Sequence, residues 1–316
     1  MDFLVSVVVP VYNGEAFIKK AITSICQQPE VHEILVINDG SDDKTQEILD
    51  KLILEYPIVK VFFHEKKSNK GRSASRNLGI RKVTGNFVAF LDADDFYLNN
   101  RFKNDKKIFN ENIECDGIYN AIGVHFYREA TLKEKERLEL TTITRKIEPD
   151  NLFEVLLSGD YGHFSIDGLT VKKKVFEKIG YFNEQLLVSE DTELFYKMAI
   201  KCNLLTGIID QPVAIRGVHE KNVSGNMNLY KFYEQKMYES LFFWSSKHKL
   251  NLKVTERFLE RIWINRYEER NYLFKDIYYW FYIVFNSPKT LISYLTIKYF
   301  PVVRQRKKLF PIFYNK

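Results

Sequence analysis

Cysteine is scarce in this sequence, and long apolar runs are missing. The 316 residues include three cysteines, Cys26, Cys115 and Cys202, and no CxxC pair. An odd, widely spaced set argues against a disulfide framework or a zinc site, and predicts reduced core residues in a cytosolic protein. No run reaches the roughly 18–20 apolar residues that span a bilayer. The N-terminal stretch has Asp2 and no basic segment, so it reads as a first strand and not as a signal peptide.

Negative charge is missing from the end of the chain. No acidic residue follows Asp276, whereas seven lysines and arginines do. Residues 226–316 hold 17 basic and 7 acidic side chains, while residues 1–225 hold 30 and 34, so the net charge of +6 is unevenly placed. This division predicts two regions with different electrostatic tasks.

Strand and helix patterns alternate over the first 95 residues. Short apolar, β-branched runs predict buried strands, and segments with helical spacing lie between them. Ser41 or Asp42 would cap the second of these helices. Such short, regular β–α steps predict an α/β fold with an open, mostly parallel sheet. Ligands of such sheets bind at the carboxyl ends of the strands. The expected strands are 4–11, 33–38, 59–63 and 87–91, with a helix over 72–83.

Two common phosphate-binding motifs are absent, since neither GxGxxG nor GxxxxGK[ST] occurs. Instead, the fourth expected strand runs into Asp92-Ala93-Asp94-Asp95. Several carboxylates held together are costly unless a cation compensates them, and oxygen ligands suit Mg²⁺ or Mn²⁺. The alternative is a solvated acidic turn that caps the next helix.

Seven short fragments occur along the chain in this order: VVVPVYN at 7–13, INDGS at 37–41, NKG at 69–71 with Arg76-Asn77, DADD at 92–95, FEKIGYFNE at 176–184, SEDTEL at 189–194 and RGVH at 216–219. Together they resemble the family 2 glycosyltransferases, which are inverting enzymes of the GT-A fold that use nucleotide-diphosphate sugars. The resemblance covers about residues 3–225. It implies a GT-A catalytic domain over 1–225, with a donor half over about 1–95 and an acceptor half over about 96–225.

The resemblance also implies a nucleotide site. Asp39 would accept the hydrogen bond of the uracil imide, and Tyr12 would stack on the base. Arg76 would reach the nucleotide or its diphosphate, with Arg72 as a second candidate on the same helical face. The alternatives are core packing for Tyr12 and a surface charge for Arg76. The complete donor-binding set is Pro10, Val11, Tyr12, Asn13, Asp39, Asn69, Arg76, Asp92 and Ala93.

A divalent cation, Mn²⁺ or Mg²⁺, is the cofactor that the resemblance implies. Asp92 would face the ribose, and Asp94 would bind the ion that bridges the two phosphates. His219 would add a further metal ligand, although a lone histidine can also be structural. Asp95 would either support the site or cap the following helix.

The resemblance assigns the chemistry to Asp191, as the base that deprotonates the acceptor hydroxyl. A helix is expected to begin at Glu190 and Asp191, with an apolar stripe of Leu194, Met198 and Leu205. The alternative is that both acids merely complement the helix dipole. Residues 120–170 match nothing specific, and three of them, His163, Ser165 and Asp167, are candidate acceptor contacts.

The region 226–316 is expected to be helical, and it is rich in aromatic and basic residues. Its last forty residues contain twelve aromatics and no acid, which indicates a surface that lies on anionic lipid. The alternatives are a helical hairpin packed on the catalytic domain or an oligomer interface. A nucleic-acid surface is disfavoured because no binding motif accompanies the charge.

The resemblance therefore implies a metal-dependent inverting hexosyltransferase. It would move a sugar from a UDP-linked donor to a hydroxyl of a glycan acceptor, one that is lipid-linked, in the synthesis of cell-surface polysaccharide or glycoconjugate. The protein would be cytoplasmic and peripheral at the inner face of the membrane. The rival hypothesis is a catalytically silent member of the same fold that binds a nucleotide sugar or a partner.

Overall fold

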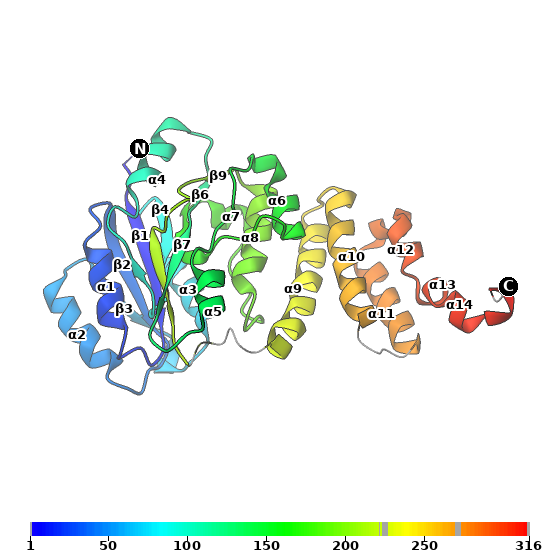
Figure 1. The fold of residues 1–316 in the computed structure, drawn as a ribbon, viewed down its shortest axis with the longest axis horizontal. Coiled ribbons are helices and arrows are strands. Elements are labelled where there is room, and N and C mark those ends of the chain that lie inside the picture. Colours follow the sequence, from blue (N-terminus) through cyan, green and yellow to red (C-terminus); the bar gives the residue numbers. More distant parts are fainter. Residues whose placement is uncertain (1, 221, 223–226, 269–272, 315–316) are drawn as a thin grey trace. The chain divides into compact units, whose positions relative to one another are not determined.

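The main sheet follows directly from the apolar runs of the sequence. The computed structural model describes residues 2–220, 222, 227–268 and 273–314, and the chain divides into two units, 1–225 and 226–316. The first unit holds a seven-stranded sheet in the order β3-β2-β1-β4-β8-β6-β9 (Figure 1). Its strands are β1 (Val5–Val11), β2 (Val31–Asn38), β3 (Val59–Phe63), β4 (Phe87–Phe90), β6 (Gly117–Tyr119), β8 (Leu169–Lys172) and β9 (Leu204–Thr206).

The first four strands are parallel and form the half of the sheet that the sequence predicts. β1 pairs with β2 and with β4, and β2 pairs with β3, all in parallel. Every residue of β1 is buried, as expected for a β-branched run covered on both faces. The prediction of a mostly parallel α/β sheet is therefore confirmed.

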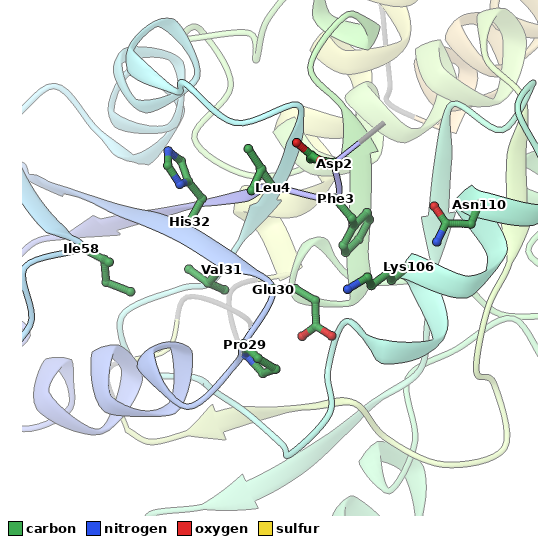
Figure 2. Close-up of a pocket in the computed structure, with 10 residues that line it drawn as sticks. All are labelled: Asp2, Phe3, Leu4, Pro29, Glu30, Val31, His32, Ile58, Lys106 and Asn110. Carbon is green, nitrogen blue, oxygen red and sulfur yellow. The ribbon is translucent and has the colours of Figure 1, made fainter.

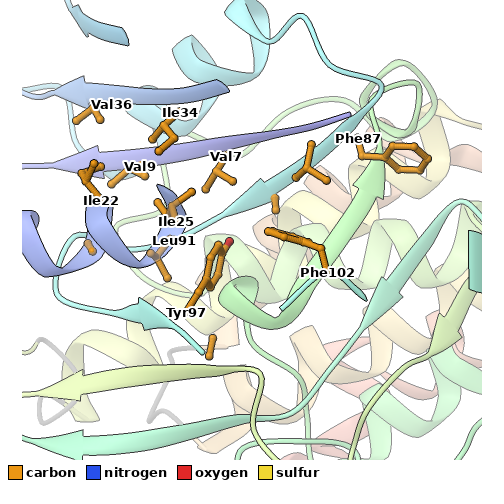
Figure 3. Close-up of a cluster of buried hydrophobic side chains, with 14 of the residues drawn as sticks. Val7, Val9, Ile22, Ile25, Ile34, Val36, Phe87, Leu91, Tyr97 and Phe102 are labelled. Carbon is orange, nitrogen blue, oxygen red and sulfur yellow. The ribbon is translucent and has the colours of Figure 1, made fainter. Parts of the chain in front are cut away.

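Helices cover both faces of this parallel half. Alternate residues of β1, from Val5 to Val11, join a core with α1 (Ile18–Cys26) and α2 (Thr45–Glu55) (Figure 3). On the other face lies α3 (Arg72–Lys82), where a Cβ atom on Gly79 would fall 2.3 Å from Cγ1 of Val8. Only glycine allows α3 to approach β1 this closely, and that approach places the arginines of α3 near the sheet's edge.

The rest of the first unit changes strand direction. β8 runs antiparallel to β4 and to β6, which itself pairs in parallel with β9. A small second sheet has the order β5-β10-β7, from β5 (Phe96–Tyr97), β10 (Ala214–Val218) and β7 (Ile122–Phe126). The remaining helices of this unit are α4 (Lys103–Glu111), α5 (Leu132–Leu138), α6 (Pro149–Ser158), α7 (Val175–Ile179) and α8 (Glu190–Lys201), with short turns η1 (Glu65–Lys67) and η2 (Ile166–Gly168).

The second unit is helical, as predicted. Its interior is built on Trp263, fully buried and stacked on Tyr267 and Tyr299. Among the described residues, no helix has both the length and the apolar character needed to cross a bilayer. The helices are α9 (Met227–Lys247), α10 (Leu252–Glu268), α11 (Leu273–Asn286), η4 (Pro288–Ile292), α12 (Tyr294–Lys298), α13 (Pro301–Arg304), α14 (Arg306–Leu309) and η5 (Pro311–Phe313).

Two local expectations are wrong. Neither Ser41 nor Asp42 caps α2, because the helix begins later, at Thr45, whose N–H donates to Asp43 Oδ1 at 2.9 Å. Leu205 does not continue the apolar stripe of α8, because the helix ends at Lys201 and Leu205 lies in β9. Leu194 and Met198 are fully buried on α8, as expected.

A cavity of about 640 Å³ opens at the amino ends of β1 and β2 (Figure 2). Phe3, Glu30, Val31 and Lys106 are among the residues that line it. Ligands of parallel sheets bind at the opposite, carboxyl edge, so this cavity is separate from the candidate site.

Candidate functional site

The candidate site lies where β1, β2 and β4 end. Because these strands are parallel, the loops that follow Val11, Asn38 and Phe90 meet at one edge of the sheet. Two of the loops are hydrogen-bonded to each other through Asn13. Its N–H donates to Ser41 Oγ at 3.0 Å, and its Oδ1 accepts from the N–H of Asp42 at 2.9 Å.

Asn13 also has a positive φ of 52°, which asparagine tolerates better than most residues. The neighbouring Tyr12 side chain is 53% exposed, so it is not a core residue. The alternative of ordinary core packing for Tyr12 is therefore wrong, and a ring is presented at the carboxyl end of β1. Pro10 and Val11 are buried at the end of the same strand, and their role as a pocket wall stays a prediction.

Asp39 is buried at the end of β2 and holds the loop after β3. Its Oδ1 accepts from the N–H of Lys70 at 2.7 Å, and its Oδ2 accepts from the N–H of Gly71 at 2.8 Å. A carboxylate has about four acceptor positions, so these two bonds leave capacity for a further donor. Asn69 in the same loop is exposed, and its Oδ1 accepts from Gly71 N–H at 3.2 Å.

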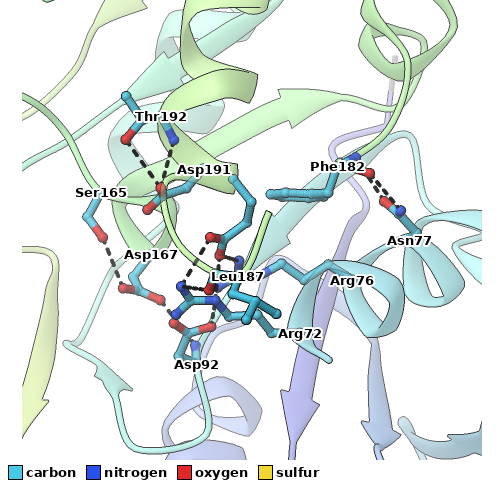
Figure 4. Close-up of polar contacts among 11 residues, drawn as sticks. Arg72, Arg76, Asn77, Asp92, Ser165, Asp167, Phe182, Leu187, Asp191 and Thr192 are labelled. Atoms are coloured by element: carbon cyan, nitrogen blue, oxygen red, sulfur yellow. Dashed lines mark hydrogen bonds and ion pairs between the residues drawn. The ribbon is translucent and has the colours of Figure 1, made fainter. Parts of the chain in front are cut away.

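Arg76 is the centre of a buried ion-pair cluster (Figure 4). Its Nη2 lies 2.6 Å from Asp92 Oδ1, and its Nη1 lies 2.9 Å from Glu190 Oε1. Arg72, one turn earlier on α3, donates from Nη2 to Glu190 Oε2 at 3.0 Å and forms an ion pair with Oε1, which lies 2.6 Å from its Nε. The guanidinium of Arg76 thus joins the loop after β4 to the first turn of α8, and it is not a helix-surface charge. Its contact with a nucleotide stays a prediction.

The same cluster sets the charges of its acids. Burial disfavours ionisation of Asp92, but Arg76 and Arg72 outweigh it and lower the pKa of Asp92. Burial and the neighbouring Asp191 raise the pKa of Glu190 against the opposing effect of both arginines. Removing one partner from such a cluster would leave an uncompensated buried charge.

Asp167 joins the site from β8's side of the sheet. Oxygens of Asp92, Asp95 and Asp167 lie within 4.8 Å of one another, and Asp167 Oδ1 accepts from the N–H of Asp92 at 3.1 Å. Burial and the nearby Asp92 raise the pKa of Asp167 to about 6. Burial and Asp167 raise the pKa of Asp95 as well. Crowded carboxyl groups of this kind favour a bound cation.

Asp95 supports the loop and does not cap a helix. Residues 96–97 form β5, and Asp95 Oδ1 accepts from the N–H of Gly217 on β10 at 2.7 Å. The helix-cap alternative for Asp95 is therefore wrong, and so is an acidic turn open to solvent, because Asp95 is buried.

Asp94 and His219 face each other across the loop. Asp94 Oδ2 lies 3.0 Å from His219 Nε2 and accepts from Asn222 Nδ2 at 3.2 Å, and the ring of Phe17 stacks on the imidazole. Burial and the charge of Asp92 raise the pKa of Asp94. An imidazole nitrogen beside a carboxylate oxygen is a donor pair that divalent metals accept, so these residues fit such an ion. Ala93 lies half-buried between the two acids of this loop.

Asp191 is half-buried in the first turn of α8, next to Glu190. Its Oδ1 accepts from the N–H of Thr192 at 2.7 Å, whereas Oδ2 accepts no hydrogen bond from the described residues. The residue before the helix, Ser189, has a φ of 65°, a conformation that costs energy outside glycine. The turn at Ser189 directs Glu190 into the arginine cluster.

The three candidate acceptor contacts lie in two different environments in the structure. Ser165 donates to Asp167 Oδ2 at 3.1 Å, so these two belong to the carboxylate cluster. His163 is exposed on the loop that leads to them. Sequence reasoning missed the ion pairs of Glu190 and the contact of Asn222 with Asp94. The SED and HxxN motifs can be read in the sequence. The sequence does not show that Glu190 pairs with arginines of α3 or that Asn222 contacts Asp94 in the loop after β4.

A family model described as glycosyl transferase family 2 matches residues 6–177. An uncharacterized glycosyltransferase of Rickettsia typhi is 32% identical over 206 residues, which cover 61% of this chain and 58% of that protein. One of Haemophilus influenzae is 29% identical over 181 residues, covering 57% and 66%. The chain thus spans less than two thirds of these relatives.

A solved structure shares the fold. The crystal structure of S. aureus TarS in complex with UDP-GlcNAc aligns with a TM-score of 0.65 at 17% identity, covering 96% of this chain and 91% of that one. The fold expected from the motifs, a GT-A domain with a helical extension, is therefore confirmed. The family model matches more than half of the residues of this chain. The chain therefore belongs to glycosyl transferase family 2.

Proposed function

We propose that this protein is an inverting hexosyltransferase that moves a sugar from a UDP-linked donor to a hydroxyl of a glycan acceptor. The observation that carries the proposal is the Arg76 bridge between Asp92 and Glu190. It links the loop where the family resemblance puts the donor to the helix turn that bears Asp191. A donor-binding carboxylate and a base would thereby share one rigid support.

Asp39 supports a uridine donor. A buried carboxylate with spare acceptor capacity prefers a ligand that brings an N–H, as the uracil imide does. Exposed Tyr12 offers its ring as a stacking partner for the base. The TarS complex with UDP-GlcNAc makes UDP the first nucleotide to test. Pro10, Val11, Asn13, Asn69 and Ala93 would complete the walls of this pocket.

Asp191 would act as the general base through its Oδ2. It would take the proton of the acceptor hydroxyl while the oxygen attacks the anomeric carbon from the side opposite the diphosphate. The bond from that carbon to the diphosphate oxygen breaks, its electron pair leaves with UDP, and the configuration inverts. General-base catalysis of this kind is worth about 10²–10⁴-fold in rate.

Asp94 and His219 would hold a divalent cation, Mn²⁺ or Mg²⁺, with Asp92 on the ribose side. When bound, such an ion neutralises the charge that develops on the departing diphosphate. Arg76 would act indirectly by keeping Asp92 ionised and oriented.

The acceptor half of the first unit, about residues 96–225, would bind the glycan. We place the reaction in the synthesis of cell-surface polysaccharide or glycoconjugate, on a lipid-linked acceptor at the cytoplasmic face of a membrane. The basic, aromatic second unit supports this location.

A donor screen tests the proposal. UDP, GDP and ADP would compete against a fluorescent nucleotide with and without Mn²⁺, and hydrolysis of the matching nucleotide sugars would be followed by NMR. We expect UDP to bind at least about tenfold more tightly than the others, because a larger purine base does not place an N–H on the free acceptor position of Asp39 as the uracil imide would. The released or transferred sugar should carry the inverted anomeric configuration. Binding without turnover of any donor or acceptor would instead identify a catalytically silent member of the family.

A further inference from the structure

The exposed side of α11 is aromatic. Phe274, Tyr278 and Phe285 are 83%, 77% and 76% exposed, and Phe281 and Tyr282 lie between them at 42% and 43%. Their spacing of i, i+4, i+7, i+8 and i+11 places all five on one face of the helix. A surface helix normally presents polar residues to water, so this face is the reverse of the usual pattern.

The opposite side of α11 already packs within its own unit. Asp276 is buried and pairs with Arg266, whose Nε lies 2.9 Å from its Oδ1. Trp280 Nε1 donates to the carbonyl of Thr296 at 2.9 Å, and Ile283 and Val284 are buried. Tyr282 also contacts Phe243 of α9, with ring centroids 5.5 Å apart, but the other four exposed rings are not needed to hold α11 in place. Apolar surface of this extent, left open to water, indicates an interaction site.

The chain that follows Asp276 carries charge of one sign. Asp276 is the last acid of the chain, and its burial and pairing with Arg266 remove it from the surface. All basic residues described after it are exposed: Lys289, Lys298, Arg304, Arg306, Lys307 and Lys308. Aromatic rings combined with unopposed basic charge are typical of segments that lie in the headgroup region of an anionic bilayer.

We infer that the aromatic face of α11, defined by Phe274, Tyr278, Phe281, Tyr282 and Phe285, docks on an anionic lipid surface. Tyrosine rings favour the boundary between headgroups and acyl chains, and phenylalanine rings bury beyond it. The basic residues that follow add attraction to the anionic headgroups, each contributing a screened electrostatic gain. A protein partner of this face would have to be uniformly acidic around an apolar centre, whereas a membrane supplies both properties.

Vesicle sedimentation of the full-length protein tests the inference. No donor or acceptor is added, so the result is independent of the proposed transfer. We expect binding to phosphatidylglycerol-containing vesicles at least about tenfold tighter than to phosphatidylcholine alone, and weaker at high salt. A Phe274→Ser, Tyr278→Ser, Phe285→Ser variant should lose about tenfold or more in affinity. Its matched control is Leu54→Ser, Ile113→Ser, Leu132→Ser, which removes equally exposed apolar side chains from the first unit.

A charge pair of variants separates the electrostatic contribution. Lys307→Glu, Lys308→Glu should weaken binding to anionic vesicles, and Lys307→Arg, Lys308→Arg should not. Circular dichroism checks that each variant stays folded. Equal binding to both vesicle types, or an aromatic variant that binds as the parent does, would overturn the inference. So would an aromatic variant that turns a dimer into a monomer while the parent ignores vesicles, because the face would then join two copies of the chain.

Discussion

Arg76 Nη2 lies 2.6 Å from Asp92 Oδ1, while the same guanidinium contacts Glu190 on α8 at 2.9 Å. One fully buried cation therefore fixes the distance between two segments that are about a hundred positions apart in the chain. Stability and donor binding are expected to depend on it together.

Replacing Arg76 by methionine should cost about 3–5 kcal/mol of unfolding free energy, because Asp92 would lose its ion-pair partner and Glu190 would keep only one of its two arginines. Affinity for UDP should fall in the same variant, since Asp92 loses its partner. Urea denaturation and calorimetry measure the two effects. Arg72→Met is the matched control. The Arg72 side chain is 38% exposed, and its replacement leaves both ion pairs of Arg76 in place. We therefore expect this variant to lose about 1 kcal/mol or less of unfolding free energy. Equal losses in both variants would contradict the central role of Arg76.

Asp191→Asn keeps the size of the side chain but cannot take a proton. We expect transfer to fall by about 10²-fold or more while the affinity for the donor barely changes. Asp150→Asn, the same change in the first turn of α6, controls for effects on the helix dipole and should be silent. Near-normal turnover of the Asp191 variant would assign the proton transfer to another group.

Asp94→Ala should abolish the Mn²⁺-dependent part of UDP binding and leave the fold intact. The variant removes the oxygen that faces His219 at 3.0 Å, so one of two proposed ligands is lost. Calorimetry with UDP in the presence of Mn²⁺ or EDTA measures the difference. Asp50→Ala, an exposed acid on α2, serves as the control. An unchanged metal dependence in the Asp94 variant would remove Asp94 from the site.

Protonation of Glu33 is expected to destabilise the folded protein at acid pH. Burial opposes its ionisation, but hydrogen bonds from Lys60, Thr84 and Ser6 outweigh burial and lower the pKa of Glu33 from 4.5 to about 2. A carboxyl group whose pKa is lower in the folded than in the unfolded state stabilises the protein at pH values above its unfolded-state pKa. This gain in stability is lost as the pH falls from about 4.5 to about 2. The gain is about 3 kcal/mol for a shift of this size.

Urea denaturation across that pH range measures this loss. The parent should lose stability more steeply than Glu33→Gln, whose side chain does not titrate. Glu47→Gln, an exposed acid on α2, should follow the parent. Parallel profiles for the parent and the Glu33 variant would show that Glu33 titrates normally.

The sequence predicted the parallel half of the fold well and the antiparallel half poorly. Runs such as Val5–Val11 are apolar at every position, and that pattern has few alternatives to a buried strand. Leu205 was expected on the apolar stripe of α8 but lies in β9. Over so few residues, the spacing of apolar positions does not distinguish the end of a helix from a short strand. Ser41 and Asp42 were reasonable caps by type, but Ser41 accepts from Asn13 instead.

The candidate site shows the same division. Asp92, Asp94 and Asp191 follow from local motifs, and the structure puts each at the sheet's carboxyl edge or on the facing helix. Asp167 was expected only as an acceptor contact, because nothing local reveals that β8 returns antiparallel to β4. The partners of Arg76 were hidden for a similar reason, since burial of a guanidinium depends on tertiary packing.

The antiparallel return of β8 beside β4 has a consequence for which part of the first unit can tolerate change. Ala89 pairs with Thr170, so η2, which carries Asp167, comes next to the end of β4 although more than seventy residues separate Asp92 from Asp167 in the chain. The roughly seventy intervening residues include α5, which buries none of its side chains. Substitutions in α5 would therefore leave the sheet and the carboxylate cluster in place, whereas β6, in the same stretch of chain, is a strand of the main sheet.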